Sequence, residues 1–352
     1  MDLNNYTAFP NIDQQNYLAE IENLPNQLEN AYQQGLRLSL PAWQGTRGVL
    51  IAGMGGSAMG ADLLAAYAAP LCPVPISVQR NYTLPAWAHG PETLVIASSH
   101  SGNTEETLSA FEQALHRECR LLALSTGGRL AKAANTSNVP LWTFEHNGQP
   151  RAAVGYSFGL LLALLRRLGL LPDPTEELSG AVKAMRSQQA GLSAELPVVR
   201  NLAKREAGQL MGRWVTVFAA EVLEPVARRW KTQINELAKA WAQSEALPEA
   251  DHNALAGLQQ PDQALSSAMA LFLRARSYHP RNLLRADLTK QAYMLEGLNT
   301  DFMDAVGETP LAQQWTALHL GDYVAYYLAM LYETDPTPIE ALEGFKRRLA
   351  QG

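Results

Sequence analysis

The stretch that decides the fold of this chain is Ser98-Ser99-His100-Ser101-Gly102-Asn103-Thr104-Glu105-Glu106-Thr107. It follows an apolar run, 93–97, that is typical of a buried parallel strand, and it precedes residues 108–115, whose apolar spacing is helical. Because a helix start offers unpaired backbone N–H groups and a positive dipole end, added hydroxyls there form a cradle for a phosphate monoester. The alternative is an ordinary capped loop, since Ser and Thr are favoured N-caps. The concentration of hydroxyls beside a Gly-Asn pair favours the phosphate.

Composition excludes several classes of protein. With 352 residues and 47% apolar residues, the chain is long enough for two globular domains. A net charge of -6 without a long basic run argues against a nucleic-acid partner. Cys72 and Cys119 form neither a disulfide framework nor a metal pattern, which fits a reducing cytoplasm. Residues 1–5 lack the features of a signal peptide, and the longest apolar run, 158–165, is too short to span a bilayer, so no membrane partner is expected.

Strands alternate with helices along the chain, which predicts an α/β fold with open, doubly wound parallel sheets. The expected strands of a first sheet are 48–52, 75–78, 93–97, 120–125 and 139–144, and those of a second are 214–219, 267–274 and 301–306. Ligands bind such sheets at the carboxyl ends of the strands, where both glycine-hydroxyl loops of the first sheet fall. The second sheet lacks these loops, so we expect it to have lost its phosphate site.

The expected domain organisation has four parts. Residues 1–37 are a helical segment, with a helix over 12–37 broken at Pro25, and residues 38–171 are the first α/β domain, which ends in a buried helix over 153–170. Residues 172–203 form a helical linker, with a polar helix from Glu177 to about Ala203. Residues 204–352 are the second domain, closed by helices over 310–332 and 338–350.

A second glycine-rich stretch, Gly53-Met54-Gly55-Gly56-Ser57-Ala58, follows the first strand. It matches the loose dinucleotide fingerprint G-x-G-x-x-A, with Arg80 at a suitable distance for an NADP contact, so a nicotinamide enzyme is one alternative. That alternative leaves the stretch 98–107 unexplained. We therefore interpret Gly56 as a point of close backbone approach and Ser57 as a further donor to a sugar phosphate.

Three residues outside these loops could carry chemistry. Arg151 precedes a helix, where a cation is electrostatically unfavourable, and it could hold a developing oxyanion or simply lie at the surface. Glu236 lies about 200° around its helix from Ile234 and so faces away from its own core; taken alone, this geometry favours a solvated side chain over a carboxylate in a cleft. His252 could move protons, although a lone His is more often structural. No metal-ligand spacing is present.

Four patches together resemble the bifunctional phosphoglucose/phosphomannose isomerases, which are sugar isomerase (SIS) proteins. They are Gly-Met-Gly-Gly-Ser at 53–57, Ser-x-Ser-Gly-Asn-Thr-x-Glu-Thr at 99–107, Pro-Arg at 150–151, and Arg-Trp-Lys-x-x-x-Asn-Glu at 229–236 with His252-Asn253. The ending, with Gly321-Asp322-Tyr323 and Asp335-Pro336-Thr337-Pro338 before Lys346, is also similar. The resemblance implies two SIS-type, flavodoxin-like domains with helical termini.

The resemblance also implies roles for individual residues. Ser57, Ser99, Ser101 and Thr104, beside the Gly56 backbone, would hold the phosphate. Glu236 would be the base that moves a proton between C1 and C2, and Arg151 would steady the enediolate. His252, from a neighbouring subunit, and Lys346 would assist ring opening, which implies a homodimer with shared active sites. Thr337 is the nearest match for the threonine that lets both C2 epimers react. No metal or redox cofactor is implied.

The expected activity is that of an intramolecular oxidoreductase, interconverting glucose 6-phosphate, and mannose 6-phosphate, with fructose 6-phosphate through an enediol. Two alternatives remain at this point. One is an isomerase of another sugar phosphate, such as a heptose or an amino sugar. The other is a non-catalytic SIS protein that senses a sugar phosphate; it would keep the cradle but would need none of Glu236, His252 and Lys346.

Overall fold

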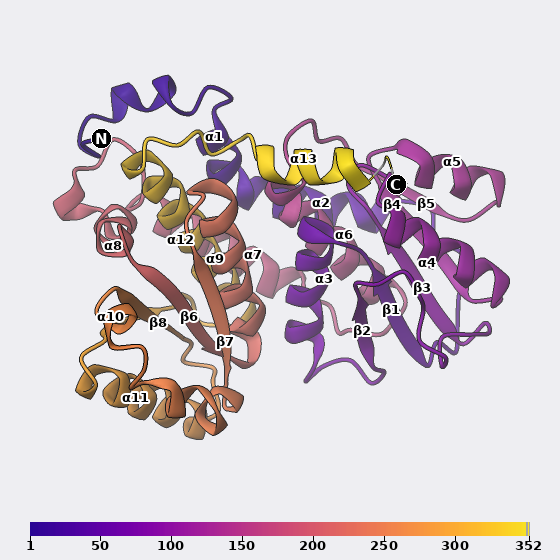
Figure 1. Ribbon diagram of the computed structural model, residues 1–352. Coiled ribbons are helices and arrows are strands. Elements are labelled where there is room, and N and C mark those ends of the chain that lie inside the picture. Colours follow the sequence, from indigo (N-terminus) through magenta and orange to yellow (C-terminus); the bar gives the residue numbers. More distant parts are fainter. Residues whose placement is uncertain (350, 352) are drawn as a thin grey trace. The chain divides into compact units, whose positions relative to one another are not determined.

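The chain folds into two compact units, each built on its own parallel sheet, as the computed structural model in Figure 1 shows. The structure describes residues 1–349 and 351, so Ala350 and Gly352, which we assigned to the last helix and the second domain, lie outside it. The five-stranded unit comprises residues 23–183 and 309–312. The four-stranded unit comprises residues 1–22, 184–308 and 313–352. The α/β fold class is confirmed, while the four-part domain organisation stays a prediction.

The five-stranded unit has strand order β2-β1-β3-β4-β5, with all neighbours parallel. Its strands are β1 (Gly48–Ala52), β2 (Ile76–Gln79), β3 (Thr93–Ser98), β4 (Arg120–Ser125) and β5 (Leu141–Thr143). Its helices are α2 (Leu24–Arg37), α3 (Gly55–Ala68), α4 (Glu105–His116), α5 (Gly128–Thr136) and α6 (Val154–Arg167), and α7 (Thr175–Gln189) begins in it. This is the flavodoxin-like order, and every strand that we expected in this sheet is present.

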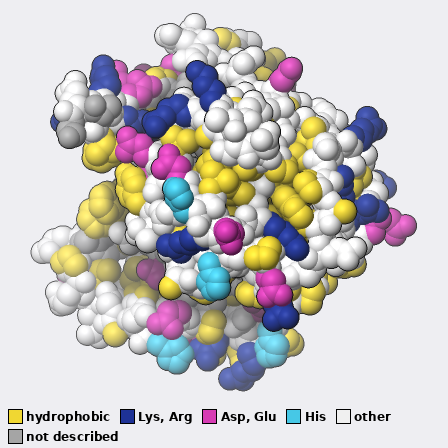
Figure 2. All heavy atoms as spheres, turned by 90° about the vertical axis from the view of Figure 1, so that its right-hand side faces the viewer, with side chains coloured by type: hydrophobic (Ala, Val, Ile, Leu, Met, Phe, Trp, Pro, Cys, Tyr) yellow, Lys and Arg dark blue, Asp and Glu magenta, His cyan; other side chains and the backbone are white. Residues whose placement is uncertain are grey.

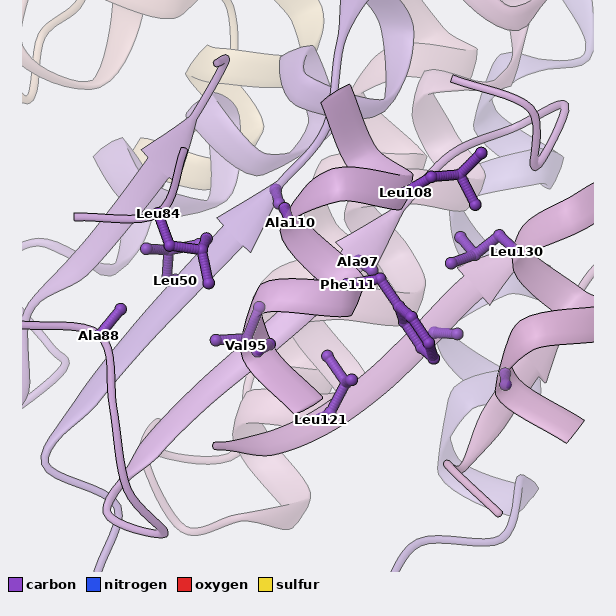
Figure 3. Close-up of a cluster of buried hydrophobic side chains, with 14 residues drawn as sticks. Leu50, Leu84, Ala88, Val95, Ala97, Leu108, Ala110, Phe111, Leu121 and Leu130 are labelled. Atoms are coloured by element: carbon purple, nitrogen blue, oxygen red, sulfur yellow. The ribbon is translucent and has the colours of Figure 1, made fainter. Parts of the chain in front are cut away.

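One face of this sheet is covered by a core cluster around α4 (Figure 3). Phe111 points from α4 onto the strands that carry Val95, Ala97 and Leu121, and all four side chains are buried. The strands β1 and β3 are buried along their whole length, which explains why their sequences are continuous apolar runs. The packed sheet therefore fixes the positions of the loops at its carboxyl edge.

The four-stranded unit repeats the same order with one strand fewer, β7-β6-β8-β9, again all parallel. Its strands are β6 (Trp214–Ala220), β7 (Ala242–Leu247), β8 (Ala268–Arg274) and β9 (Asn299–Asp304). Its helices are α1 (Tyr17–Glu22), α8 (Leu202–Leu210), α9 (Glu224–Leu237), α10 (Asp262–Leu265), α11 (Pro280–Leu295) and α13 (Glu340–Leu349), together with nearly all of α12 (Pro310–Leu331). The similar topology that we expected of the two sheets is present.

Three local details differ from the sequence predictions. The helix expected over 12–37 is two helices that meet at Asn23, and Pro25 lies in the first turn of α2, where a missing N–H does no harm. The helix expected from Glu177 to Ala203 ends at Gln189, and α8 begins after Asn201, whose side chain caps it. Strand β7 was not expected, because its sequence is polar.

Two buried ionisable groups in the four-stranded unit titrate abnormally. Burial, followed by the charge of Asp301, raises the pKa of Glu206 to about 7. Burial lowers the pKa of His319 to about 4, although its Nε2 donates to the carbonyl oxygen of Ile21 over 2.8 Å. Both groups are therefore neutral in the folded protein over part of the pH range in which they would be charged in the unfolded chain.

Candidate active site

The two glycine-hydroxyl loops lie side by side at the carboxyl edge of the five-stranded sheet. One follows β1 and leads into α3, and the other follows β3 and leads into α4. Strands β1 and β3 are neighbours, and the order of the sheet reverses between them, so the loops flank the point where such sheets bind ligands. Two positive helix ends therefore meet at this edge.

The loop 99–104 is shaped by its own hydroxyls. The Ser99 Oγ accepts the N–H of Gly102 over 3.1 Å and lies 2.9 Å from the Thr104 Oγ1. Gly102 has a φ of +68°, and a Cβ there would overlap the carbonyl oxygen of Gly127, so only glycine fits. The Ser101 Oγ accepts the N–H of Asn103 over 3.2 Å.

The capped-loop alternative predicts that a hydroxyl of this loop closes the first turn of α4. Thr104 is the N-cap residue, but its side chain makes no capping hydrogen bond, because it pairs with Ser99. The N-cap residue of α3 is Met54, which makes no side-chain capping bond either. Both helix starts thus keep the character of an anion site, which favours the phosphate over the cap.

Ser57 and Gly56 connect this loop with its neighbours. The buried Ser57 accepts the N–H of His100 over 3.1 Å through its Oγ, so the two loops are joined. A Cβ at Gly56 would overlap the carbonyl oxygen of Pro150 and lie 3.2 Å from the Cα of Arg151. The start of α3 is therefore packed directly against the segment that carries Arg151.

Arg151 lies in a short 3-10 helix, η2 (Pro150–Ala153), and is buried. Its Nη1 donates to the Oε1 of Gln149 over 3.4 Å. A fixed cation beside the start of α3 is the arrangement expected where the protein binds an anion. The structure thus brings Gly56, Ser57 and Arg151 together at the edge that carries the loop 99–104.

The nicotinamide alternative finds no support at Arg80. The guanidinium of Arg80 binds the carboxylate of Asp62 on α3 and the carbonyl oxygen of Ala58, the latter over 3.4 Å. The cation that would have held a ribose phosphate is paired within the fold.

Glu236 lies on α9 in the four-stranded unit and is half-buried. The ammonium of Lys239 bridges two segments, since it donates to the carbonyl oxygen of Glu236 over 2.9 Å and to that of Asp335 over 2.7 Å. The Asp335 carboxylate in turn accepts the N–H of the buried Thr337 over 2.8 Å. Lys239 therefore holds the end of α9 against the segment that carries Thr337.

A buried ion pair fixes α9 on α12. Arg229 donates to both carboxylate oxygens of Asp322, over 3.0 and 2.8 Å, and the two side chains are 2% and 3% exposed. Burial disfavours the charged form of Arg229, but the Asp322 carboxylate outweighs it and raises the pKa of the guanidinium. Beside the pair, the Trp230 Nε1 donates to the carbonyl oxygen of Ala317 over 2.9 Å.

His252 and Lys346 are both exposed. His252 ends a short 3-10 helix, η5 (Glu249–His252). The preceding residue, Asp251, binds α11 through Arg285 over 2.7 Å and Thr289 over 2.6 Å, so the backbone beside His252 is anchored. Lys346 lies in the last turn of α13, a helix whose described residues include no buried one.

Comparison with known proteins shows which family the chain belongs to. Residues 199–349 match the bacterial phospho-glucose isomerase C-terminal SIS domain. A bifunctional phosphoglucose/phosphomannose isomerase of Caldicellulosiruptor bescii is 36% identical over 335 residues, which cover 94% of this chain and 98% of the relative. The chain belongs to the bifunctional phosphoglucose/phosphomannose isomerase family.

A second relative agrees with that membership, and a solved structure agrees with the fold. A bifunctional phosphoglucose/phosphomannose isomerase of Aquifex aeolicus is 31% identical, with 86% of this chain and 90% of the relative covered. The crystal structure of a glucose-6-phosphate isomerase like protein from Thermus thermophilus superposes with a TM-score of 0.63 at 20% identity, covering 97% of this chain and 99% of the other. The resemblance and the SIS-type fold expected from the sequence are confirmed, while the residue roles stay predictions.

In the four-stranded unit the loop after β6 is hydrogen-bonded to the start of α11. Glu221 follows β6 with a φ of +49°, and its Oε1 accepts the N–H of His279 over 2.8 Å and the Nδ2 of Asn282 over 2.7 Å, at the start of α11. The Tyr278 hydroxyl accepts the N–H of Ala220 over 3.0 Å. A carboxylate and a phenol of the chain itself thus occupy the position that corresponds to the phosphate loop.

Sequence reasoning missed two contacts. One is made by Lys239, and the other joins His100 and His146, whose Nε2 and Nδ1 atoms lie 2.9 Å apart. Lys239 carries no motif, and only the fold shows which carbonyl oxygens it binds. His100 does stand inside the hydroxyl-rich stretch, which was a signal that we did not use.

On the face shown in Figure 2, basic and acidic side chains are interspersed. Among the residues that the structure describes, no helix combines the length and the apolar character needed to cross a bilayer.

Proposed function

We propose that this chain is an aldose–ketose isomerase that interconverts glucose 6-phosphate and mannose 6-phosphate with fructose 6-phosphate. The observation that carries the proposal is the 36% identity with a bifunctional phosphoglucose/phosphomannose isomerase over nearly the whole chain. The reaction moves hydrogen between two carbons without net oxidation, so it needs no redox cofactor. The protein would act in the cytoplasm, a reducing compartment that suits the free cysteines Cys72 and Cys119.

The phosphate of the substrate would bind to the loop 99–104 and to Ser57, at the two helix starts. The uncapped start of α4 and the hydrogen bonds that order the loop support this assignment. Binding energy from this remote group would position the reacting carbons C1 and C2.

The chemical step would need a base and an electrophile. Glu236 would take the C2 proton from the open-chain aldose and return it to C1, and the guanidinium of Arg151 would stabilise the negative oxygens of the enediolate. Two observations support these roles. Arg151 is packed against the start of α3. Lys239 donates hydrogen bonds to the carbonyl oxygens of Glu236 and Asp335 and so holds Glu236 near the segment of Thr337. Thr337 would lie beside the C2 hydroxyl and accommodate both epimers, and Lys346 would assist ring opening.

A homodimer would complete the site, with His252 entering from the neighbouring subunit to assist ring opening. His252 is exposed and its backbone is anchored to α11, so it is presented on a stable surface. The helix α11 also exposes apolar side chains, with Leu284 at 43%, Leu288 at 54% and Leu295 at 76% exposed. Exposed leucines on the helix that anchors Asp251 fit a surface that would be covered in a dimer.

The substrate is tested with purified protein and fructose 6-phosphate, following glucose 6-phosphate and mannose 6-phosphate separately. We expect both products. Turnover of an amino-sugar or heptose phosphate in place of both would show that the chain is an isomerase of another sugar. Binding of fructose 6-phosphate without any turnover would show that it is a sensor.

The base is tested with Glu236→Gln. General base catalysis contributes about 10²–10⁴-fold, so kcat for both epimers should fall at least that far while sugar phosphate binding survives. Exchange of the C2 hydrogen of glucose 6-phosphate with deuterated solvent, followed by NMR, reads out the step directly. The matched control is Glu224→Gln on the same helix, which should exchange at the parent rate. Exchange at that rate in Glu236→Gln would show that Glu236 is a solvated side chain.

The shared site is tested by mixing two inactive variants. Glu236→Gln and His252→Ala chains, once their subunits have exchanged, should recover part of the parent activity, because hybrid dimers contain one site with both native residues. Exchange of subunits without recovery of activity would refute the dimeric site.

A further inference from the structure

Two imidazoles meet beside the phosphate loop. The Nε2 of His100 lies 2.9 Å from the Nδ1 of His146, and the ring planes are nearly perpendicular, at 84°. At this distance one nitrogen carries the shared proton and donates, and the other accepts. Because each neutral imidazole has one donor and one acceptor, the pair forms without any charge.

His100 is a fixed partner in this bond. Its N–H donates to the Ser57 Oγ over 3.1 Å, and its carbonyl oxygen accepts from the Oγ1 of Thr126 over 2.7 Å and from the N–H of Thr126 over 3.1 Å. The backbone of His100 is thereby held from both sides by the loops after β1 and β4. Its ring projects from a rigid part of the phosphate site.

His146 belongs to the segment that leads from β5 to α6. At the start of this segment Phe144 stacks on Tyr156, with ring centroids 4.9 Å apart and an angle of 19° between the planes. The His146 ring contacts Tyr156 edge-on at 5.8 Å, and the His100 ring contacts Phe144 at 5.8 Å. Four rings therefore close the segment 144–156 into a loop, and Arg151 lies between its two ends.

We propose that His100 and His146 are positioning residues, whose hydrogen bond holds the segment 144–156 so that Arg151 faces the bound sugar. The stacked rings restrain the segment without fixing its direction, whereas an N–H···N bond does fix it. The bond joins the loop 99–104 to the segment that carries Arg151. It therefore fixes the distance between the phosphate-binding loop and the guanidinium that would stabilise the enediolate. The inference rests on the role of Arg151 given under the proposed function.

The test replaces each imidazole with a ring that cannot form the bond. His146→Phe and His100→Phe should each lower kcat by about tenfold, the value of one hydrogen bond. The inhibition constant of inorganic phosphate should stay within about twofold of the parent, because the loop 99–104 keeps its own hydrogen bonds. The double variant should be no slower than either single variant, since both remove the same bond. His146→Gln, which retains a donor and an acceptor, should recover part of the loss.

NMR of protein with ¹⁵N-labelled histidine gives a signature that packing alone does not produce. In the parent, each of the two histidines should show one protonated and one unprotonated ring nitrogen. The proton shared between the two rings should exchange slowly with water. In His146→Phe the His100 ring should lose that signature. The matched control is His116→Phe, an exposed histidine in the last turn of α4, which should alter neither kcat nor the His100 resonances.

The outcomes separate this inference from the proposed function. In an Arg151→Ala background, His146→Phe should lower kcat no further, because the bond acts through Arg151. If Arg151→Ala is slow but His146→Phe turns over at the parent rate, or if the two losses multiply, the positioning role is wrong and the proposed function stands. If Arg151→Ala keeps the parent kcat, both the role of Arg151 and this inference are wrong.

Discussion

The buried pair of Arg229 and Asp322 supports one prediction with a clear magnitude. Asp322→Asn keeps the size of the side chain but removes the charge that faces both donating nitrogens of the guanidinium. At 2% and 3% exposure, water cannot replace that charge. Removing one partner of a buried pair costs about 3–5 kcal/mol, so we expect the free energy of unfolding to fall by that amount.

Two further variants separate charge isolation from loss of packing. Replacing both partners, as Arg229→Met with Asp322→Leu, removes both buried charges and should restore most of the lost stability. Glu224→Gln is the control for an exposed pair on the same helix, because Glu224 and Arg228 lie 3.7 Å apart and are 49% and 42% exposed. Its cost should stay below about 1 kcal/mol.

Urea unfolding followed by tryptophan fluorescence measures these effects, since Trp230 and Trp315 are buried in the same unit. A cost below about 1 kcal/mol for Asp322→Asn would refute the reasoning, because it would mean that burying the guanidinium without the Asp322 charge is not penalised. A double variant as unstable as the single one would show that shape, not charge, decides the stability here.

Three further predictions concern the loop and the buried titrating groups. Ser101→Ala with Thr104→Ala should raise the KM for the sugar phosphate at least about a hundredfold, as expected from two lost bonds to a charged group of roughly 1.5–3 kcal/mol each; an unchanged KM and unchanged phosphate inhibition would exclude the site. Gly102→Ala should abolish phosphate binding, because its φ of +68° and the nearby carbonyl oxygen exclude a Cβ; isothermal titration with inorganic phosphate measures this, and parent-like binding would contradict it. Because the pKa of Glu206 is raised to about 7, the free energy of unfolding should fall by about 3 kcal/mol as the pH rises from about 4.5 to 7. Because the pKa of His319 is lowered to about 4, the free energy of unfolding should rise by about 3 kcal/mol as the pH rises from about 4 to 6.5. These two effects oppose each other, so the urea midpoint of the parent should change little from about pH 4.5 to 6.5. In Glu206→Gln only the effect of His319 remains, and the urea midpoint should fall as the pH is lowered. A Glu206→Gln profile parallel to that of the parent would refute the assignment.

The central strands of the first sheet, β1, β3 and β4, could be predicted from the sequence because they are buried on both faces. A strand such as β3 then has to be a continuous apolar run, and its ends are marked by glycine and hydroxyl residues. β7 could not be predicted in this way. It lies at the edge of its sheet and is largely half-exposed, so it tolerates Gln243, Ser244 and Glu245, whose pattern resembles a loop.

Parts of the candidate site that are local in sequence could be predicted, whereas contacts between distant residues could not. The loop 99–104 is local in sequence, so its chemistry could be inferred from one short stretch. The bond between His100 and His146 joins residues 46 apart, and the bonds of Lys239 join Glu236 to Asp335, 96 residues from the lysine. Such contacts depend on how the segments pack, and no periodicity or motif encodes them.

The Glu221 carboxylate at the start of α11 has a consequence for how a duplicated fold diverges. A βαβ unit without a bound ligand still carries a helix start that attracts an anion. The start of α11 is exposed and is capped by His279, whose Nδ1 accepts the N–H of Arg281 over 3.1 Å. In the four-stranded unit Glu221 supplies the anion permanently, although this requires a left-handed φ of +49° on a residue with a side chain. The loop after β6 thus differs from the loop after β1 by an added acid as well as by the missing Gly-Gly-Ser sequence. In this chain the residue after β6 is therefore an acid, Glu221, whereas the residue after β1 is Gly53.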